Sequence, residues 1–241
     1  MMITGRRAFI LQNTRLQRPP FVPELRLHLA DEITPLWHMT EAELGARGVP
    51  PPFWAFAWAG GLALARYLLD HPAEVAGKQV IDFAAGSGLC ALAALLVGAA
   101  AALAADIDPF CEAAVALNAD ANGLYVAYTG QDLLAADPPP ADVILAGDIC
   151  YEQPLAARVL AWLQAAHARG TRVLIGDPGR SYFPRDELIR LAAYEVPTSR
   201  ELEDSVVKAA GVFTFPVAPT PSREQAAPRV ARPASGRQTA T

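Results

Sequence analysis

The sequence predicts an α/β fold, a single domain built on a doubly wound, Rossmann-like and mainly parallel sheet of seven strands. Two observations lead to this prediction. Short β-type runs alternate with apolar helical stretches between about residues 58 and 178, and such alternation is typical of parallel sheets whose strands are connected by helices. Hydrophobic residues make up 52% of the 241 residues and charged residues only 19%. The chain can therefore bury a core, and disorder along its whole length is excluded.

The predicted elements alternate in order along the middle of the chain. We expect strands over residues 79–84, 100–105, 124–129, 143–147 and 171–176, and helices over residues 60–69, 89–97, 109–122 and 154–168. Asp108 is expected to cap the third of these helices, with Pro109 in its first turn. Beyond them, residues 179–216 are predicted to form a helix followed by strands.

The composition changes at both ends of the chain. We expect residues 1–57 to form an N-terminal arm that ends in an aromatic entry segment, residues 58–216 to form the main domain, and residues 217–241 to form a disordered tail. The tail is mostly Pro, Ala, Arg, Ser and Thr, so it cannot bury enough apolar surface to offset the entropy of ordering it. The first 23 residues of the arm hold four arginines and no acid. We expect a bacterial cytoplasmic protein, and a mitochondrial one only if this arm is a presequence.

Charge and cysteine content exclude several classes of protein. The formal net charge of −5 lacks the basic excess of a nucleic-acid binder. The longest apolar run, residues 89–105, is rich in alanine and interrupted by Gly98, so no membrane span is expected. Three widely spaced cysteines, Cys90, Cys111 and Cys150, predict neither a disulfide framework nor a metal site. With no heptads, the chain is expected to be a monomer.

An aspartate stands at or just after the end of each predicted strand. These residues are Asp82, Asp106, Asp132, Asp148 and Asp177. Open parallel sheets bind their ligands at the carboxyl ends of the strands, so we expect the five side chains to border one crevice. Any one of them also suits a helix cap or a loop, but their coincidence at every strand end favours a site.

A glycine loop, Gly-Ser-Gly at residues 86–88, follows the first predicted strand. Glycine lets a ligand approach the backbone closely, and Asp106, 20 residues beyond the first glycine, can accept hydrogen bonds from a ribose. The loop alone also suits a dinucleotide, since Ala91 meets the permissive GxGxxA pattern. Asp82, however, suits an ammonium group and would repel a pyrophosphate. The side chains of residues 131–132 (Gln-Asp) can hydrogen-bond an adenine amino group. Together with Asp82, they favour S-adenosylmethionine over a dinucleotide.

Four stretches of the chain resemble known methyltransferases. Residues 82–88 (DFAAGSG) resemble motif I of the class I, seven-strand enzymes that use S-adenosylmethionine. Residues 148–151 (DICY) resemble the D-x-x-Y motif after the fourth strand of their protein-lysine branch. Residues 52–61 (PFWAFAWAGG) and 176–180 (GDPGR) are similar to bacterial relatives of the electron transfer flavoprotein β-subunit lysine methyltransferase. The resemblance covers about residues 20–215.

The resemblance implies a cofactor, S-adenosyl-L-methionine, and a protein substrate that presents a lysine. It implies contacts to the methionine part of the cofactor from Asp82 and the glycine loop, to the ribose from Asp106, and to the adenine from Asp132. The implied cofactor-binding set is Trp58, Asp82, Ala84, Gly86, Ser87, Gly88, Asp106, Ile107, Asp132 and Asp148. The implied catalytic residues are Asp148 and Tyr151, and the implied substrate contacts are Phe53, Trp54, Asp177 and Arg180.

Residues 177–180 (Asp-Pro-Gly-Arg) argue against a nucleobase substrate. They stand where amino methylases acting on nucleobases or glutamine amides carry Asn/Asp-Pro-Pro-Tyr/Phe. Sites for flipped bases stack the base on aromatic or apolar groups, and this sequence lacks that aromatic. Arg180 is expected either to contact an acidic partner surface or to be a solvated loop charge.

The implied reaction is an in-line displacement at a sulfonium methyl group by a neutral lysine nitrogen. Free lysine has a pKa of about 10.4, so the site must bind the ammonium and let it lose a proton. Three other functions fit parts of the sequence: a small-molecule, nicotinamide-like N-methyltransferase, an NAD-dependent oxidoreductase that uses the same glycine loop, and a non-catalytic binding module with a relic pocket. No metal, nucleic acid or membrane partner is expected.

Overall fold

The structure, a computed structural model, describes residues 3–39, 41–46, 48–198 and 205–216. The predicted disordered tail, residues 217–241, lies outside these residues. Within them, no helix is long and apolar enough to cross a membrane.

Seven strands form one sheet, as predicted. From edge to edge they are β5 (Ala127–Thr129), β4 (Ala101–Ala105), β3 (Gln79–Phe83), β6 (Val143–Gly147), β7 (Arg172–Asp177), β9 (Val207–Thr214) and β8 (Ile189–Pro197). The first five are parallel, while β9 runs antiparallel to both of its neighbours. The mainly parallel, doubly wound sheet is therefore confirmed.

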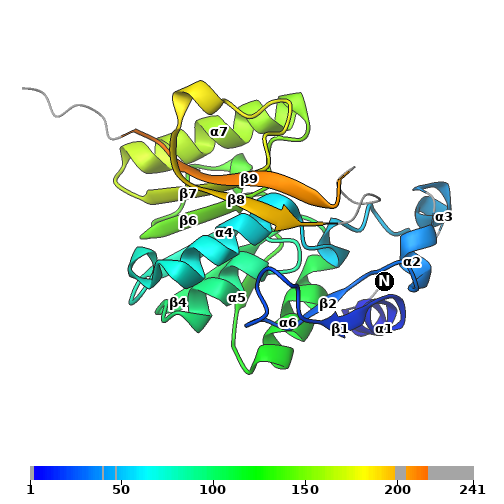
Figure 1. The fold of residues 1–241 in the computed structure, drawn as a ribbon. Helices are drawn as coiled ribbons and strands as arrows, with labels where there is room; N and C mark the ends of the chain where they lie inside the picture. The colour runs from blue at the N-terminus through cyan, green and yellow to red at the C-terminus, as the bar shows by residue number, and fades with distance from the viewer. Residues whose placement is uncertain (1–2, 40, 47, 199–204, 217–241) are drawn as a thin grey trace, which may run out of the picture.

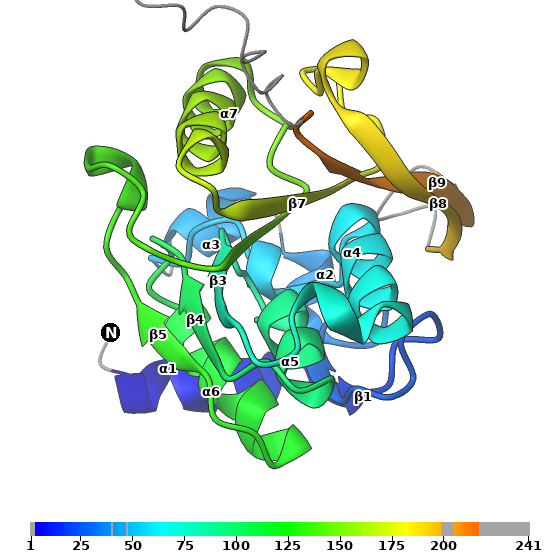
Figure 2. The same cartoon turned by 90° about the vertical axis from the view of Figure 1, so that its left-hand side faces the viewer.

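Helices cover both faces of the sheet, which gives three layers (Figures 1 and 2). One face carries α4 (Ala59–Asp70), α5 (Leu89–Leu96) and α6 (Cys111–Asn122), and the other carries α7 (Gln153–Ala168). The buried residues of α7 recur every three or four positions, at Ala156, Val159, Leu163 and Ala166, which is the stripe of a helix that lies on a sheet. An apolar cluster fills the space on each side of the sheet.

The predicted strands and helices between residues 58 and 178 are found, with small shifts at their ends. The largest shift is in β5, which begins at Ala127. The predicted cap of α6 is wrong. The Asp108 carboxylate accepts from the Phe110 N–H at 2.8 Å, and this turn delays the helix, so that Phe110 is its N-cap.

The helix predicted within residues 179–216 is not found in the described part of this range, residues 179–198 and 205–216. There, a short 3₁₀ turn, η4 (Arg185–Glu187), precedes the antiparallel strands β8 and β9. The two strands pair along their length, from Ile189 opposite Thr214 to Pro197 opposite Val207. The Leu and Ala content of β8 favours a helix locally, but pairing with β9 outweighs that preference.

The N-terminal arm is packed against the sheet-and-helix body. It contains α1 (Ile3–Asn13), the β1–β2 hairpin (Arg15–Gln17 and Leu27–Leu29), α2 (Pro35–His38), α3 (Glu41–Ala46) and the 3₁₀ turn η1 (Phe53–Ala55). The fully buried Asn118 of α6 ties the arm to the glycine loop, because its side chain accepts from His28 N–H at 2.7 Å and donates to the Ser87 carbonyl at 2.9 Å. Ile10 of α1 is also fully buried, so the folded body includes residues before position 20.

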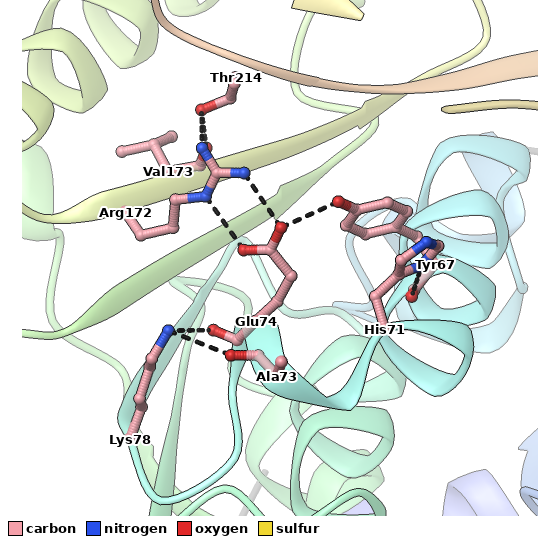
Figure 3. A network of polar contacts seen from close by, with 8 residues as sticks. All are labelled: Tyr67, His71, Ala73, Glu74, Lys78, Arg172, Val173 and Thr214. Carbon is pink, nitrogen blue, oxygen red and sulfur yellow. Dashed lines mark hydrogen bonds and ion pairs between the residues drawn. The ribbon is translucent and has the colours of Figure 1, made fainter. Parts of the chain in front are cut away.

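A polar network fixes the edge of the sheet where β7 begins (Figure 3). Glu74, in the 3₁₀ turn η2 (Pro72–Glu74), accepts two hydrogen bonds of 3.1 Å from Arg172 and one of 2.9 Å from the Tyr67 hydroxyl. Arg172 also donates to the Thr214 hydroxyl at 3.1 Å. Burial opposes ionisation of Glu74, but Arg172 and Tyr67 outweigh it and lower its pKa. The network joins α4, β7 and β9 at the edge where the parallel strands begin, opposite their carboxyl ends.

Candidate active site

A cavity of about 610 Å³ lies at the carboxyl ends of β3, β4 and β6. The strand order reverses here, because β4 and β5 lie on one side of β3 and β6 lies on the other. Ligands of open α/β sheets bind at such a switch point, and the volume is in the range of small-molecule sites. Of the predicted cofactor-binding residues, those that line the cavity are Trp58, Asp82, Ala84, Gly86, Ser87, Asp106, Ile107, Asp132 and Asp148.

The loop after β3 turns sharply through left-handed backbone conformations. Ala84 has φ +53° and Gly86 has φ +52°, and a left-handed conformation at a residue other than glycine is typical of functional sites. The turn presents the backbone of residues 84–87 to the cavity. It also directs the chain into α5, whose amino end lies beside the site.

Asp106, at the end of β4, holds the glycine loop in place. Its Oδ2 atom accepts from Gly86 N–H at 2.9 Å, and its Oδ1 atom accepts from Asp108 N–H at 2.9 Å. A carboxylate has about four lone-pair positions, so two of them are left for a ligand. The next residue, Ile107, is 71% exposed beside the cavity, where it can cover a flat ligand ring.

Asp82 is a buried carboxyl group in β3, below the loop. Its Oδ2 atom accepts from Ala91 N–H at 2.8 Å. Burial raises its pKa to about 8, the hydrogen bond from Ala91 opposes this, and the charge of Asp106 adds to it. A cation bound in the cavity would favour the ionised form.

Asp132 marks the other end of the cavity, after β5. It caps the 3₁₀ turn η3 (Leu133–Ala135), because its Oδ1 atom accepts from Leu134 N–H at 2.9 Å. Leu133 and Leu134 line the cavity beside it. An acidic side chain next to two apolar ones suits a ring with an exocyclic amino group.

Asp148, directly after β6, is the most constrained acid of the site. Its backbone has φ +55°, its Oδ2 atom accepts from Gly61 N–H at 2.7 Å, and its Oδ1 atom lies 2.9 Å from Arg180 Nη2. Burial raises its pKa to about 7, while Arg180 and the Gly61 amide oppose that rise. The carboxyl group is thus able to ionise near neutral pH at a fixed position.

Glycines let the amino end of α4 lie directly on the sheet. A Cβ atom on Gly60 would overlap the Gly176 carbonyl oxygen and stand 2.7 Å from Asp148 Oδ2, and one on Gly147 would stand 3.0 Å from Gly61 Cα. Only glycine permits this approach. It brings the Gly61 amide, at the positive end of a helix, to the Asp148 carboxylate.

Aromatic rings form the wall opposite Asp148. The Phe53 ring centroid lies 5.9 Å from that of Trp58 and 5.6 Å from that of Tyr151. Trp58 is held by its Nε1–H, which donates to the Phe53 carbonyl at 2.9 Å, and the Arg180 guanidinium carbon lies 5.8 Å from the Trp58 ring centroid. Phe53 and Tyr151 are each 49% exposed, so they stand at the mouth of the cavity.

Comparisons with known proteins identify the family. A family model described as ribosomal protein L11 methyltransferase (PrmA) matches residues 64–152. The electron transfer flavoprotein beta subunit lysine methyltransferase of Xenopus laevis is 37% identical over 215 residues, which cover 87% of this chain and 86% of the relative. The human protein of the same name is 35% identical and covers 87% of this chain and 81% of the relative. The chain belongs to the electron transfer flavoprotein beta subunit lysine methyltransferase family.

Family membership makes the chain an S-adenosylmethionine-dependent methyltransferase and excludes the oxidoreductase interpretation. A crystal structure of ribosomal protein L11 methylase from Lactobacillus delbrueckii subsp. bulgaricus is similar to it with a TM-score of 0.47 and 22% identity, over 66% of this chain and 80% of the other.

The cavity of this methyltransferase fits S-adenosylmethionine. The cofactor carries a sulfonium and an ammonium group, and Asp82, whose buried carboxyl ionises best beside a cation, borders the cavity. The free lone pairs of Asp106 suit the ribose hydroxyls, and Asp132 with its apolar neighbours suits the adenine. Within the described residues, no group of three or more His, Cys, Asp or Glu side chains is placed so that it could hold a metal ion.

Two residues that are predicted to contact the substrate do not line the cavity. Trp54 is fully buried and stacks on Phe110, with ring centroids 5.8 Å apart and an angle of 8° between the ring planes, so it packs in the core. Asp177 is also buried, and its Oδ1 atom accepts from Gly179 N–H at 2.6 Å and from Arg180 N–H at 2.8 Å. It therefore shapes the loop that carries Arg180.

Gly88 and Arg180 also require correction. The Gly88 N–H donates to the Ala85 carbonyl at 2.7 Å, and its Cα packs so closely on Val115 that a Cβ atom would stand 3.1 Å from that side chain. It is the N-cap of α5 and does not line the cavity. Arg180 is neither a solvated loop charge nor directed to an outer surface, because it pairs with Asp148 inside the cavity.

Several cavity residues were not predicted from the sequence. They include Pro50, Pro51, Leu89, Cys90, Asp108, Cys111, Leu155, Arg158 and Val159. Asp108 could have been predicted from the sequence, because it directly follows Asp106 and Ile107. In the structure, burial raises its pKa to about 6. Leu155 and Val159 could not have been predicted, because the apolar face of a helix that lies on a sheet is predicted to be core along its whole length. Arg158 could not either, because a single arginine on a helix is usually a solvated surface charge.

Proposed function

We propose that this protein methylates a lysine side chain of a protein substrate, with the electron transfer flavoprotein beta subunit as the first candidate. The pairing of an aromatic wall with the Asp148 carboxylate carries this proposal. Together they form a narrow acceptor end beside the cofactor-binding acids, and both elements attract a cationic amine. The relatives' printed names supply the candidate substrate.

The site's own residues account for the steps before methyl transfer. A lysine enters past Phe53 and Tyr151, and its ammonium is held by the aromatic faces and by Asp148 Oδ1. Asp148, with a pKa of about 7, is suited to accept a proton near neutral pH. Alignment of the neutral nitrogen with the methyl group then supplies much of the rate.

Bound S-adenosylmethionine supplies an electrophilic methyl group on sulfur. Held beside Asp82, Asp106 and Asp132, it would supply the methyl carbon to the lone pair of the lysine nitrogen, and its sulfur would keep the electron pair of the carbon–sulfur bond. The protein's contribution is position, a dry cavity and removal of the proton.

We further propose that Asp148 and Tyr151 are the catalytic residues, and that Phe53 and Arg180 border the bound lysine. We also propose that residues 58–216 form the catalytic domain, on which residues 1–57 pack. The expected setting is the cytoplasm, with the enzyme a monomer that acts on neither nucleic acid nor membranes. The net charge of −5 supports the expectation that the enzyme does not bind nucleic acid.

Transfer of label from radioactive S-adenosylmethionine tests the proposal. The purified enzyme would be given the electron transfer flavoprotein beta subunit, a lysate from cells that lack the enzyme, or the protein-free fraction of that lysate. We expect label in the flavoprotein subunit or in another protein of the lysate. Label only in the protein-free fraction would show a small-molecule methyltransferase instead.

A further inference from the structure

A second, polar cavity adjoins the acceptor end of the cofactor cavity. It has a volume of about 300 Å³ and is lined by Tyr151, Pro178, Gly179, Arg180, Ser181 and Lys208. Tyr151 and Arg180 line both cavities, so these two side chains stand between them.

The Arg180 guanidinium lies where a substrate ammonium would bind. Its Nη2 atom is 2.9 Å from Asp148 Oδ1, and its central carbon is 5.8 Å from the centroid of the Trp58 ring. The other carboxylate oxygen, Oδ2, accepts from Gly61 N–H at 2.7 Å. The Arg180 guanidinium therefore occupies both groups that would hold a substrate ammonium. These are Asp148 Oδ1, the oxygen that α4 does not bind, and the face of the Trp58 ring.

We infer that the Arg180 guanidinium occupies the position of the acceptor ammonium before substrate binds. An incoming lysine then displaces the guanidinium from Asp148 toward the adjoining polar cavity. This inference rests on the proposed function. Exchange of one cation for another keeps the 10% exposed Asp148 side chain paired, which avoids the cost of a buried carboxylate without a partner. A guanidinium stays protonated at any ordinary pH, so Arg180 holds the place without competing for the methyl group.

The loop that carries Arg180 is fixed, so the displacement takes place in its side chain. Asp177 Oδ1 accepts from the N–H groups of both Gly179 and Arg180. Gly179 has φ +84°, and a Cβ atom there would overlap the Arg185 guanidinium. The Arg180 side chain itself is 22% exposed, and the adjoining cavity gives it room to move.

The exchange makes the site selective for cations. An uncharged ligand cannot replace the positive charge of Arg180 beside Asp148, so the ion pair between Arg180 and Asp148 stays intact. A lysine brings a charge of the same sign on a chain long enough to pass the aromatic mouth. The selected substrate class is therefore a flexible primary amine that is protonated in solution.

Replacement of Arg180 by lysine tests the inference directly. If position 180 occupies the acceptor site, the Arg180→Lys variant carries a primary amine there and methylates itself at that position. The nitrogen lone pair forms the bond to the methyl carbon, the carbon–sulfur electron pair stays on sulfur, and the displaced proton passes to Asp148. We expect peptide mass spectrometry to find methyl groups at position 180, added at a rate per molecule that does not depend on enzyme concentration.

The matched control is Arg185→Lys, which places a lysine on the same loop outside the acceptor end and is expected to stay unmodified at position 185. An Arg180→Lys variant that binds S-adenosylhomocysteine as the wild type does, yet carries no methyl group at position 180, would overturn the inference. Self-methylation at position 180 by an enzyme that modifies no protein of a lysate would uphold the inference and reject the proposed substrate class.

A second variant measures the displacement in the normal reaction. Arg180→Gln removes the competing cation, so at about pH 9, where Asp148 is ionised, the KM for the protein substrate should fall about threefold or more, the equivalent of a weak ion pair. Affinity for S-adenosylhomocysteine should not change. A KM that stays the same or rises at this pH would contradict displacement of Arg180.

Discussion

Arg180 Nη2 lies 2.9 Å from Asp148 Oδ1, although the two residues are 32 positions apart in the chain. The contact joins the loops after two neighbouring strands, β6 and β7, at the end of the cavity opposite Asp132. In the proposed function, the loops after β3, β4 and β5 bind the cofactor, and the loops after β6 and β7 bind the acceptor lysine together with the aromatic wall.

Asp106→Ala should weaken binding of S-adenosylhomocysteine strongly. The change removes the acceptor of the Gly86 N–H and the proposed partner of the ribose. Hydrogen bonds to charged groups contribute about 1.5–3 kcal/mol, so we expect a loss of roughly 10–100-fold in affinity, measured by titration calorimetry. Asp137→Ala, at a side chain that is 96% exposed, is the control. Unchanged affinity in Asp106→Ala would remove the ribose assignment.

Asp148→Asn should separate catalysis from cofactor binding. Loss of the carboxylate removes the proposed proton acceptor, and we expect kcat/KM to fall by about 100-fold or more, with affinity for S-adenosylhomocysteine changed only a few-fold. In the wild type, activity should fall as the pH drops through about 7, because Asp148, whose pKa is raised by burial to about 7, takes up a proton. The variant should lack this inflection, and its persistence in a pH–rate profile would assign it to another group.

Gly60→Ala should destabilise the protein through overpacking. The added Cβ would overlap the Gly176 carbonyl oxygen, and such clashes in a packed core cost about 1–3 kcal/mol. Gly45→Ala is the matched control, because nothing lies within 4 Å of a Cβ at that helical position, and it should stabilise by about 0.5–1 kcal/mol. Urea unfolding measures both. Equal stability of the two variants would refute the close contact between α4 and β7.

Asp82→Asn should change how stability depends on pH. Burial raises the pKa of Asp82 to about 8, whereas the unfolded chain has a value of about 3.9. Between these values the folded protein holds a proton that the unfolded chain releases. This carboxyl therefore makes the free energy of unfolding fall as the pH rises from about 4 to about 8.

The asparagine at position 82 keeps an acceptor for the Ala91 N–H but does not titrate. Urea unfolding at several pH values across this window should show a smaller fall in the free energy of unfolding for Asp82→Asn than for the wild type. Equal slopes would mean that Asp82 is ionised in the folded protein.

The parts of the fold that depend on local chemistry could be predicted from the sequence. The glycine loop and the strand-end positions of Asp106 and Asp148 follow from alternating apolar runs and turn residues, which are local signals. β8 could not be predicted, because its helix-like composition is outweighed by pairing with β9, a strand that lies beyond it in the chain.

The sequence also could not predict which aromatic residues pack in the core and which line the cavity. Trp54 and Trp58 lie in the same aromatic segment, yet one is fully buried in the core while the other lines the cavity. Composition cannot separate these roles, since tryptophan suits both. The Asp148–Arg180 pair is a long-range contact, and only the folded sheet brings its two loops together.

Mass spectrometry of the electron transfer flavoprotein beta subunit shows whether the enzyme methylates its lysines and whether Asp148 is needed. The subunit would be incubated with S-adenosylmethionine and with wild-type, Asp148→Asn or Asp137→Ala enzyme, and its peptides then searched for methylated lysines. The account predicts one or more methylated lysines with the wild type and with Asp137→Ala, and little or none with Asp148→Asn. Equal methylation by wild type and Asp148→Asn, or methyl groups on residues other than lysine, would contradict it.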